Sequence, residues 1–131
     1  MKVLALDYGR ARTGVAVSDP TGTVARPLCV VERAATADGL ARVLQLIADE
    51  AVDRVVVGLP LTLRGERGEQ AEETERFVEA LSAQVAVPVV MFDERFTTTL
   101  ASRSSSTAPE DARAAAHLLT SYLTWSSGAR A

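Results

Sequence analysis

The sequence contains one cysteine, one histidine and no apolar run long enough to cross a bilayer. Because Cys29 is alone, neither an internal disulfide nor a cluster of thiolate metal ligands can form, which suits a reducing compartment. A membrane-spanning helix needs roughly 20 apolar residues, and Asp7 interrupts the N-terminal apolar segment that could otherwise resemble a signal peptide. We therefore expect a cytoplasmic protein with no membrane partner.

A large excess of charge of either sign is also absent. The net charge is −3, which argues against a broad basic surface for nucleic acid but not against a local one. Of the 14 basic residues 13 are arginine, whose planar guanidinium suits bidentate phosphate contacts. The apolar fraction of 47% is typical of globular proteins, and 131 residues is the size of one domain. We expect a single domain over residues 1–131.

The apolar residues change their pattern along the chain. Three short runs open it and predict an antiparallel meander of strands over 2–7, 13–19 and 23–31. Pro27 places the third run at a sheet edge, because proline cannot donate to a ladder on both sides. Helical spacing and continuous apolar runs then alternate, predicting a helix over 38–51, a strand over 53–60, a helix over 68–84, a strand over 85–92 and a helix over 109–125. The expected fold is α/β, a mixed five-stranded sheet covered by helices.

Acidic residues stand where two of these strands end. Asp7 ends the first strand, and Asp93 and Glu94 end the last one. Because the carboxyl ends of parallel strands meet at one edge of a sheet, these carboxylates should lie together, where they would repel one another. Oxygen ligands without thiolates suit Mg²⁺ or Mn²⁺. Two such ions about 4 Å apart can activate a water and stabilise the leaving oxygen in phosphodiester hydrolysis, so the pattern favours a nuclease.

A third acid lies at the start of the last helix. The segment T-A-P-E at 107–110 is a capping-box pattern with proline in the first turn, which places Asp111 in that turn. The apolar residues spaced to share its helix face are Ala115, Leu118, Tyr122 and Trp125. Asp111 could therefore point toward the sheet, or it could, like Glu110, simply complement the helix dipole.

Four segments together resemble the YqgF family, whose members are described as Holliday-junction-resolvase-like and as pre-16S ribosomal RNA nucleases. They are DYGxxRxGVAVSD at 7–19, VVVGLPLTLRGERGEQA at 55–71, FDERFTT at 92–98 and DARAAAHLLTSYL at 111–123. The resemblance covers nearly the whole chain in order. It implies a ribonuclease H-like fold and a metal-dependent hydrolase of phosphodiester bonds, acting on the 5′ end of pre-16S rRNA, on branched DNA such as Holliday junctions, or on both.

The resemblance also assigns the acids. It makes Asp7, Glu94 and Asp111 the metal-binding catalytic residues, holding two Mg²⁺ or Mn²⁺ ions. Glu110 and Asp93 are the alternatives to Asp111. Cutting a four-way junction would require two active sites and hence a homodimer.

Four arginines are candidates for substrate binding. Arg12 and Arg95 lie next to catalytic acids in the sequence and could hold a phosphate or neutralise those acids. Arg64 and Arg67 belong to the segment 61–68, which is a candidate substrate loop or an ordinary solvated connection. Thr97 and Thr98 are expected to cap a helix after the last strand.

One departure from the family pattern supports a different reading. Where family members carry a longer, lysine-rich stretch, SRSSSTAPE at 102–110 supplies only Arg103. This modestly favours a protein that binds nucleic acid or ribosome precursors without cutting. A further alternative is an actin-like nucleotide-binding domain, because D-Y-G-x-x-R-T-G-V-A at 7–16 also resembles the first phosphate loop of those proteins. Such proteins hold nucleotide between two domains.

Overall fold

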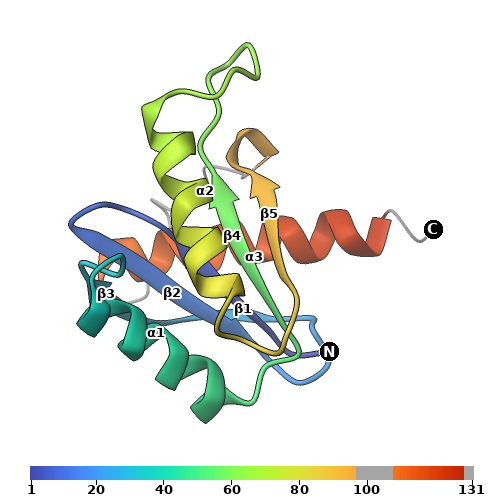
Figure 1. Cartoon of the computed structure of the whole chain (residues 1–131). Coiled ribbons are helices and arrows are strands. Elements are labelled where there is room, and N and C mark those ends of the chain that lie inside the picture. The colour runs from blue at the N-terminus through green and yellow to red at the C-terminus, as the bar shows by residue number, and fades with distance from the viewer. Residues whose placement is uncertain (97–107, 129–131) are drawn as a thin grey trace.

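The computed structural model describes residues 1–96 and 108–128 as one central sheet with helices on both faces (Figure 1). Its elements, in chain order, are β1 (Val3–Asp7), β2 (Arg12–Ser18), β3 (Ala25–Glu32), α1 (Ala37–Glu50), β4 (Arg54–Leu59), α2 (Glu69–Ser82), β5 (Val89–Asp93), the short 3₁₀ helix η1 (Glu94–Phe96) and α3 (Glu110–Gly128). Each predicted strand and helix has its counterpart in this order.

The sheet is mixed and has the strand order β3-β2-β1-β4-β5. The pairs β1–β2 and β2–β3 are antiparallel, whereas β1–β4 and β4–β5 are parallel. β3 is an edge strand, as Pro27 predicted, and its register with β2 shifts opposite Val15 and Ala16. The predicted α/β fold is confirmed. β1, β4 and β5 deliver their carboxyl ends to one edge, which we call the carboxyl edge.

Alternate residues of the central strands build two separate cores. Leu4 and Leu6 of β1 face α1 and α2, together with Val55 and Val57 of β4. Val3 and Ala5 face α3 on the other side. This alternation follows from the two-residue period of a strand. The sheet is therefore buried on both faces, and α3 crosses behind it in Figure 1.

The predicted helix faces are largely confirmed. α2 buries Ala71, Thr74, Phe77, Val78 and Leu81, which are the residues at helical spacing. In α3 the exception is Trp125, which was expected on the buried face but is 55% exposed. It lies near the end of the helix, where its ring packs at 5.7 Å from the ring of Phe92 and leaves one side open.

The last strand is shorter than predicted at its start. The expected range was 85–92, but β5 begins at Val89. Pro88 has no N–H to donate and only accepts, through its carbonyl, a 2.9 Å bond from the Val55 N–H. The apolar residues before it pack against the core without joining the ladder. The proposed caps at Thr97, Thr98 and Thr107 lie outside the described residues, as does Arg103.

None of the helices within residues 1–96 and 108–128 has the length and apolar character required to cross a membrane.

Candidate active site

Asp7 is the last residue of β1 and lies at the carboxyl edge. The four residues before it, Val3–Leu6, are buried at 0–2% exposure, whereas Asp7 itself is partly buried. In the ladder it stands opposite Gly14 of β2. The buried strand therefore holds this carboxylate at the rim of the core, where only part of it reaches water.

Glu94 follows β5 directly and begins η1. The strand between β1 and β5 is β4, and its Gly58 leaves room for the Glu94 side chain: a Cβ at Gly58 would stand 2.5 Å from Glu94 Oε1. The Glu94 carboxyl crosses β4 at this point and comes close enough to the carboxyl of Asp7 for each group to shift the pKa of the other. Two acids that are 87 positions apart in the chain thus meet, as predicted.

Both carboxyls of this pair have raised pKa values. Burial foremost, together with the interaction with Asp7 and the charges of Asp7 and Asp93, raises the pKa of Glu94 to about 8. Burial also raises the pKa of Asp7, against the lowering effect of its interaction with Glu94. The two carboxyls therefore resist ionising together.

Asp111 reaches the same edge from α3. Gly14 of β2 lets the helix approach, because a Cβ there would lie 1.8 Å from the backbone oxygen of Asp111. The negative charge of Asp111 contributes to the raised pKa of Asp7, so Asp111 lies at the same edge, although it does not line the cavity that Asp7 and Glu94 line. However, the Asp111 carboxylate is engaged by Arg12, whose Nε donates to Oδ2 at 3.0 Å.

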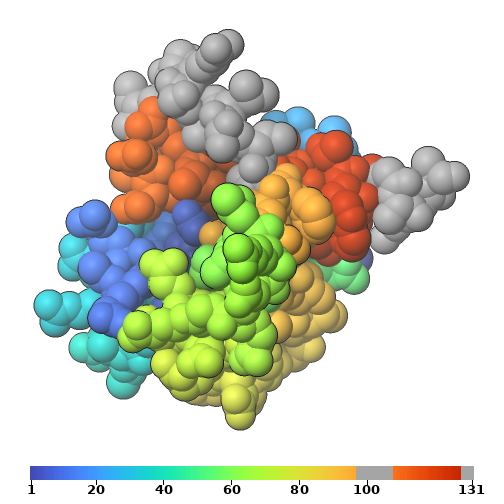
Figure 2. All heavy atoms as spheres, turned by 90° about the horizontal axis from the view of Figure 1, so that it is seen from above, coloured from blue at the N-terminus to red at the C-terminus, as the bar shows by residue number. Residues whose placement is uncertain are grey.

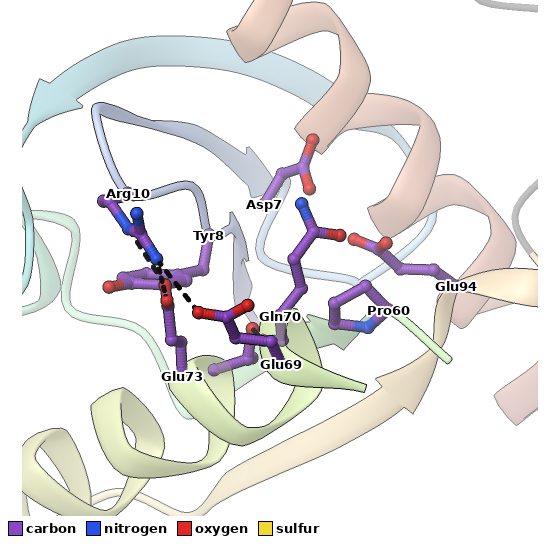
Figure 3. Close-up of a pocket in the computed structure, with 9 residues that line it drawn as sticks. Asp7, Tyr8, Arg10, Pro60, Glu69, Gln70, Glu73 and Glu94 are labelled. Atoms are coloured by element: carbon purple, nitrogen blue, oxygen red, sulfur yellow. Dashed lines mark hydrogen bonds and ion pairs between the residues drawn. The ribbon is translucent and has the colours of Figure 1, made fainter. Parts of the chain in front are cut away.

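The site opens into a cavity of about 550 Å³. In Figure 3 the side chains of Asp7, Gln70 and Glu94 point toward one another across it. The wall formed by α2 also carries Glu73, which is ion-paired with Arg10 of the β1–β2 turn. Tyr8 lines the cavity as well and stacks on Phe77 with ring centroids 4.6 Å apart.

Sequence reasoning did not select several of these lining residues. Gln70 comes directly after the predicted loop at 61–68, in the first turn of α2, and Arg10 lies in the turn after Asp7. Because Gln70 and Arg10 are far apart in the sequence, the sequence alone did not indicate that both line the same cavity. The only signal was that both follow a strand that ends at the carboxyl edge.

The other arginines predicted to bind substrate lie outside the cavity lining. Arg95 pairs with Asp93, with Nη2 at 2.6 Å from Oδ2, and thus does not neutralise Glu94. Arg67 donates through Nε to Glu75 Oε1 at 2.8 Å, and Arg64 is exposed. Their role in substrate binding stays a prediction.

The donor atoms suit a hard divalent cation. Asp7 and Glu94 present partly buried carboxyl oxygens with raised pKa values at one cavity, and a hard cation there would favour the ionised form of both. As placed in residues 1–96 and 108–128, no three His, Cys, Asp or Glu side chains are close enough to form a metal-binding group. Asp111 is held by Arg12 instead. Of the two alternatives to it, Asp93 is held by Arg95 and Glu110 is exposed.

Comparisons with known proteins agree with this fold. The family model described as RuvX, Holliday junction resolvase, matches residues 1–125. A Chloroflexus aurantiacus protein named "Putative pre-16S rRNA nuclease" is 48% identical over 99 residues, which are 76% of this chain and 65% of that protein. A Roseiflexus protein of the same name is 44% identical over 102 residues, 78% of this chain and 72% of that protein. The chain thus spans less than two thirds of the length of the Chloroflexus relative.

Solved structures share the fold at low sequence identity. RuvC from T. thermophilus, in complex with a Holliday junction substrate, superposes with a TM-score of 0.65 at 20% identity and covers 98% of this chain and 96% of its own. The fowlpox virus Holliday junction resolvase gives a TM-score of 0.57 at 12% identity over 95% of this chain and 99% of its own. The fold is therefore ribonuclease H-like, as the sequence resemblance implied. With the family model matched over residues 1–125, the chain belongs to the RuvX family of Holliday junction resolvases.

Proposed function

We propose that this protein is a divalent-metal-dependent nuclease that hydrolyses phosphodiester bonds in structured nucleic acid. The observation that carries the proposal is the juxtaposition of the Asp7 and Glu94 carboxyls, which line one cavity at the carboxyl edge, are partly buried and have raised pKa values. Such a pair costs stability in the absence of a cation, which is typical of a site selected for chemistry. The names of the relatives suggest precursor 16S rRNA as substrate, and the family description suggests branched DNA.

Asp7, Glu94 and Asp111 would hold the cations, Mg²⁺ or Mn²⁺, of which we propose two. When bound, the cations would lower the pKa of an attacking water and stabilise the leaving oxygen. Asp7 would be the shared ligand, which is supported by the influence of both Glu94 and Asp111 on its pKa. Because burial raises the pKa values of both Glu94 and Asp7, a bound cation would favour ionisation of the pair.

The other polar residues at the edge would position the substrate. Gln70 points to the acid pair from α2 and can offer its amide N–H to a phosphate oxygen (Figure 3). Arg12 is 64% exposed and can exchange the Asp111 carboxylate for a phosphate oxygen. Arg64, Arg67 and Arg95 lie on the same side of the sheet edge and would contact more distant phosphates.

The test is cleavage of labelled 5′ precursor 16S rRNA transcripts and of four-way DNA junctions with Mn²⁺, with Mg²⁺ or with EDTA. The wild-type protein should cut at least one substrate with a divalent metal and none with EDTA. Asp7→Asn should fold and bind as the wild type does but yield no products. Undiminished cleavage by Asp7→Asn would refute the mechanism, and binding without products under every metal condition would favour the non-catalytic binder.

A junction-cutting enzyme must act twice on a symmetric substrate, so we propose that it would work as a homodimer on branched DNA. Sedimentation of the protein with and without junction DNA would measure this. A monomer that cuts precursor rRNA would assign the activity to RNA and remove the need for a second subunit.

A further inference from the structure

The connection between β4 and α2 forms a small ordered hairpin. It projects from the carboxyl edge in Figure 1 and faces the viewer in Figure 2. The Thr62 N–H donates to the Glu66 carbonyl at 3.0 Å, and the Gly65 N–H donates to the Thr62 carbonyl at 2.8 Å. Gly65 has a φ of +80°, a conformation that glycine adopts without strain. The hairpin is therefore held by its own backbone and not by the core.

The tip of this hairpin carries a leucine that packs on nothing. Leu63 is 95% exposed, the highest value among the exposed large apolar residues of the described ranges. Met91, Phe96 and Trp125, by contrast, line a shared groove of about 390 Å³ along β5. Leu63 does not contribute to the stability of the fold, because an apolar side chain is stabilising only when it is buried.

The hairpin is tied to the strand end that bears Glu94. Arg95, the next residue, donates through Nη1 to the Leu63 carbonyl at 3.4 Å while its Nη2 holds Asp93. Gly65 lies against the same guanidinium, because a Cβ there would stand 3.2 Å from Nη1. A single arginine thus ties the backbone at Leu63 to the segment that carries Glu94.

The charges around the tip suit a nucleic acid. Arg64 and Arg67 both follow Leu63 within the hairpin. Arg64 is exposed and has no ion pair among the described residues, whereas Arg67 is paired with Glu75. Glu66 is the one acid in the turn and its side chain is exposed. Apolar side chains flanked by arginines act as wedges between base pairs in proteins that kink duplexes.

We propose that Leu63 is a wedge that inserts between adjacent bases of the bound nucleic acid and unstacks them beside the acid pair. The proposal rests on the nuclease function above, since it requires nucleic acid at the carboxyl edge. It assigns the hairpin to strand distortion, with Arg64 holding the backbone and Arg95 setting the angle of the tip. Substrates with a weakly stacked step or a branch point would be preferred, because unstacking costs least there.

The test uses the full chain with Asp7→Asn to prevent cutting, and a duplex RNA and a four-way DNA junction that carry 2-aminopurine at successive positions. Binding should raise the fluorescence at one step, which reports local unstacking. Adding Leu63→Ala should abolish most of this rise while changing the affinity measured by anisotropy by less than about 5-fold. Val24→Ala is the matched control, because Val24 is 64% exposed in a hydrogen-bonded turn at the opposite edge.

In the cutting-competent chain, Leu63→Ala should reduce kcat/KM on duplex or branched substrates by about 10-fold and leave a flexible single strand nearly unaffected. If the Leu63→Ala variant unstacked bases as much as the wild type does, the wedge proposal would be wrong, and the proposed nuclease function would stand. Leu63-dependent unstacking without any cleavage would refute the nuclease and keep the wedge. If Leu63→Ala instead lost binding to a protein partner while base unstacking stayed as in the wild type, Leu63 would be assigned to a protein contact.

Discussion

The two edges of the sheet use carboxylates in opposite ways. At the edge opposite the site, Asp19 follows β2 and accepts hydrogen bonds from the hydroxyl of Thr21 and from the N–H groups of Thr23 and Val24, each N–H at 2.8 Å. These bonds, that of the Thr21 hydroxyl foremost, hold the pKa of Asp19 far below its usual range. At the carboxyl edge, burial instead raises the pKa values of Asp7 and Glu94.

The difference separates an acid that serves the fold from acids that serve chemistry. The ionised form of Asp19 is stabilised by its turn, so its charge favours folding. Desolvation destabilises the ionised forms of both Asp7 and Glu94, and Asp7 further destabilises the ionised form of Glu94. A chain that retains such a pair gives up stability at this edge, and a cation or a substrate is needed to recover it.

The largest expected effect is that a substitution at the carboxyl edge removes activity, whereas a substitution at the opposite edge lowers stability. Glu94→Gln should lower metal-dependent cleavage by about 10³-fold or more, because it removes a cation ligand. Asp19→Asn should leave cleavage within about 2-fold and lower the melting temperature, because its turn loses an ionic acceptor. Rates under single-turnover conditions and thermal melts check both. Equal loss of activity in the two variants would break the comparison.

A second effect concerns the glycine that lets α3 reach the site. Gly14→Ala should destabilise the protein by about 2 to 3 kcal/mol and displace Asp111, because its Cβ would lie 1.8 Å from the Asp111 backbone oxygen. Gly68→Ala is the matched control: a Cβ there meets nothing within 4 Å, and the cost should stay below about 1 kcal/mol. Urea denaturation measures both. A neutral Gly14→Ala would mean that the helix can move without harm.

A third effect is the pH dependence of stability in EDTA. The pKa of Glu94 is raised from 4.5 to about 8, so the native state binds more protons than the unfolded state across that window. The free energy of unfolding should therefore fall as the pH rises from 5 to 8, on the order of 1 to 2 kcal/mol after solvent screening.

In Glu94→Gln this pH slope should largely disappear. Mn²⁺ should reduce it in the wild type, since a cation favours the ionised pair. For Asp19 the pH dependence of stability has the opposite sign. The stability that its charge contributes is lost only as the pH falls below about 3.8. A rise in wild-type stability between pH 5 and 8 would contradict the raised pKa values.

The smallest expected effect tests the ion pair between Arg12 and Asp111. Both side chains are substantially exposed, at 64% and 43%, so Arg12→Gln should change stability by less than about 1 kcal/mol. If Arg12 also holds a phosphate, KM should rise about 3- to 10-fold with kcat nearly unchanged. A lower kcat at constant KM would mean that Arg12 acts through Asp111 alone.

Much of the site was predictable because it depends on local patterns and one rule of topology. The apolar runs that end at Asp7 and at Glu94 are continuous, and strands that alternate with helices pair in parallel, so their ends had to meet. The failures were local: the start of β5 was placed too early because apolar residues before Pro88 read as strand, and Trp125 was placed in the core by spacing alone. That residues 1–131 form one nuclease domain stays a prediction.

The amino-acid sequence by itself determined the order of strands and helices, the family and the meeting of Asp7 with Glu94, because hydrophobic period and chain direction act over short distances. Only the tertiary structure decided which partners the charges take: Glu94 lies beside Asp7, whereas Arg12 pairs with Asp111 and Arg95 with Asp93. It also placed Gln70 in the cavity and left Leu63 in water. Side-chain direction depends on the packing of segments far apart in the chain, and that packing leaves no periodic trace in the sequence.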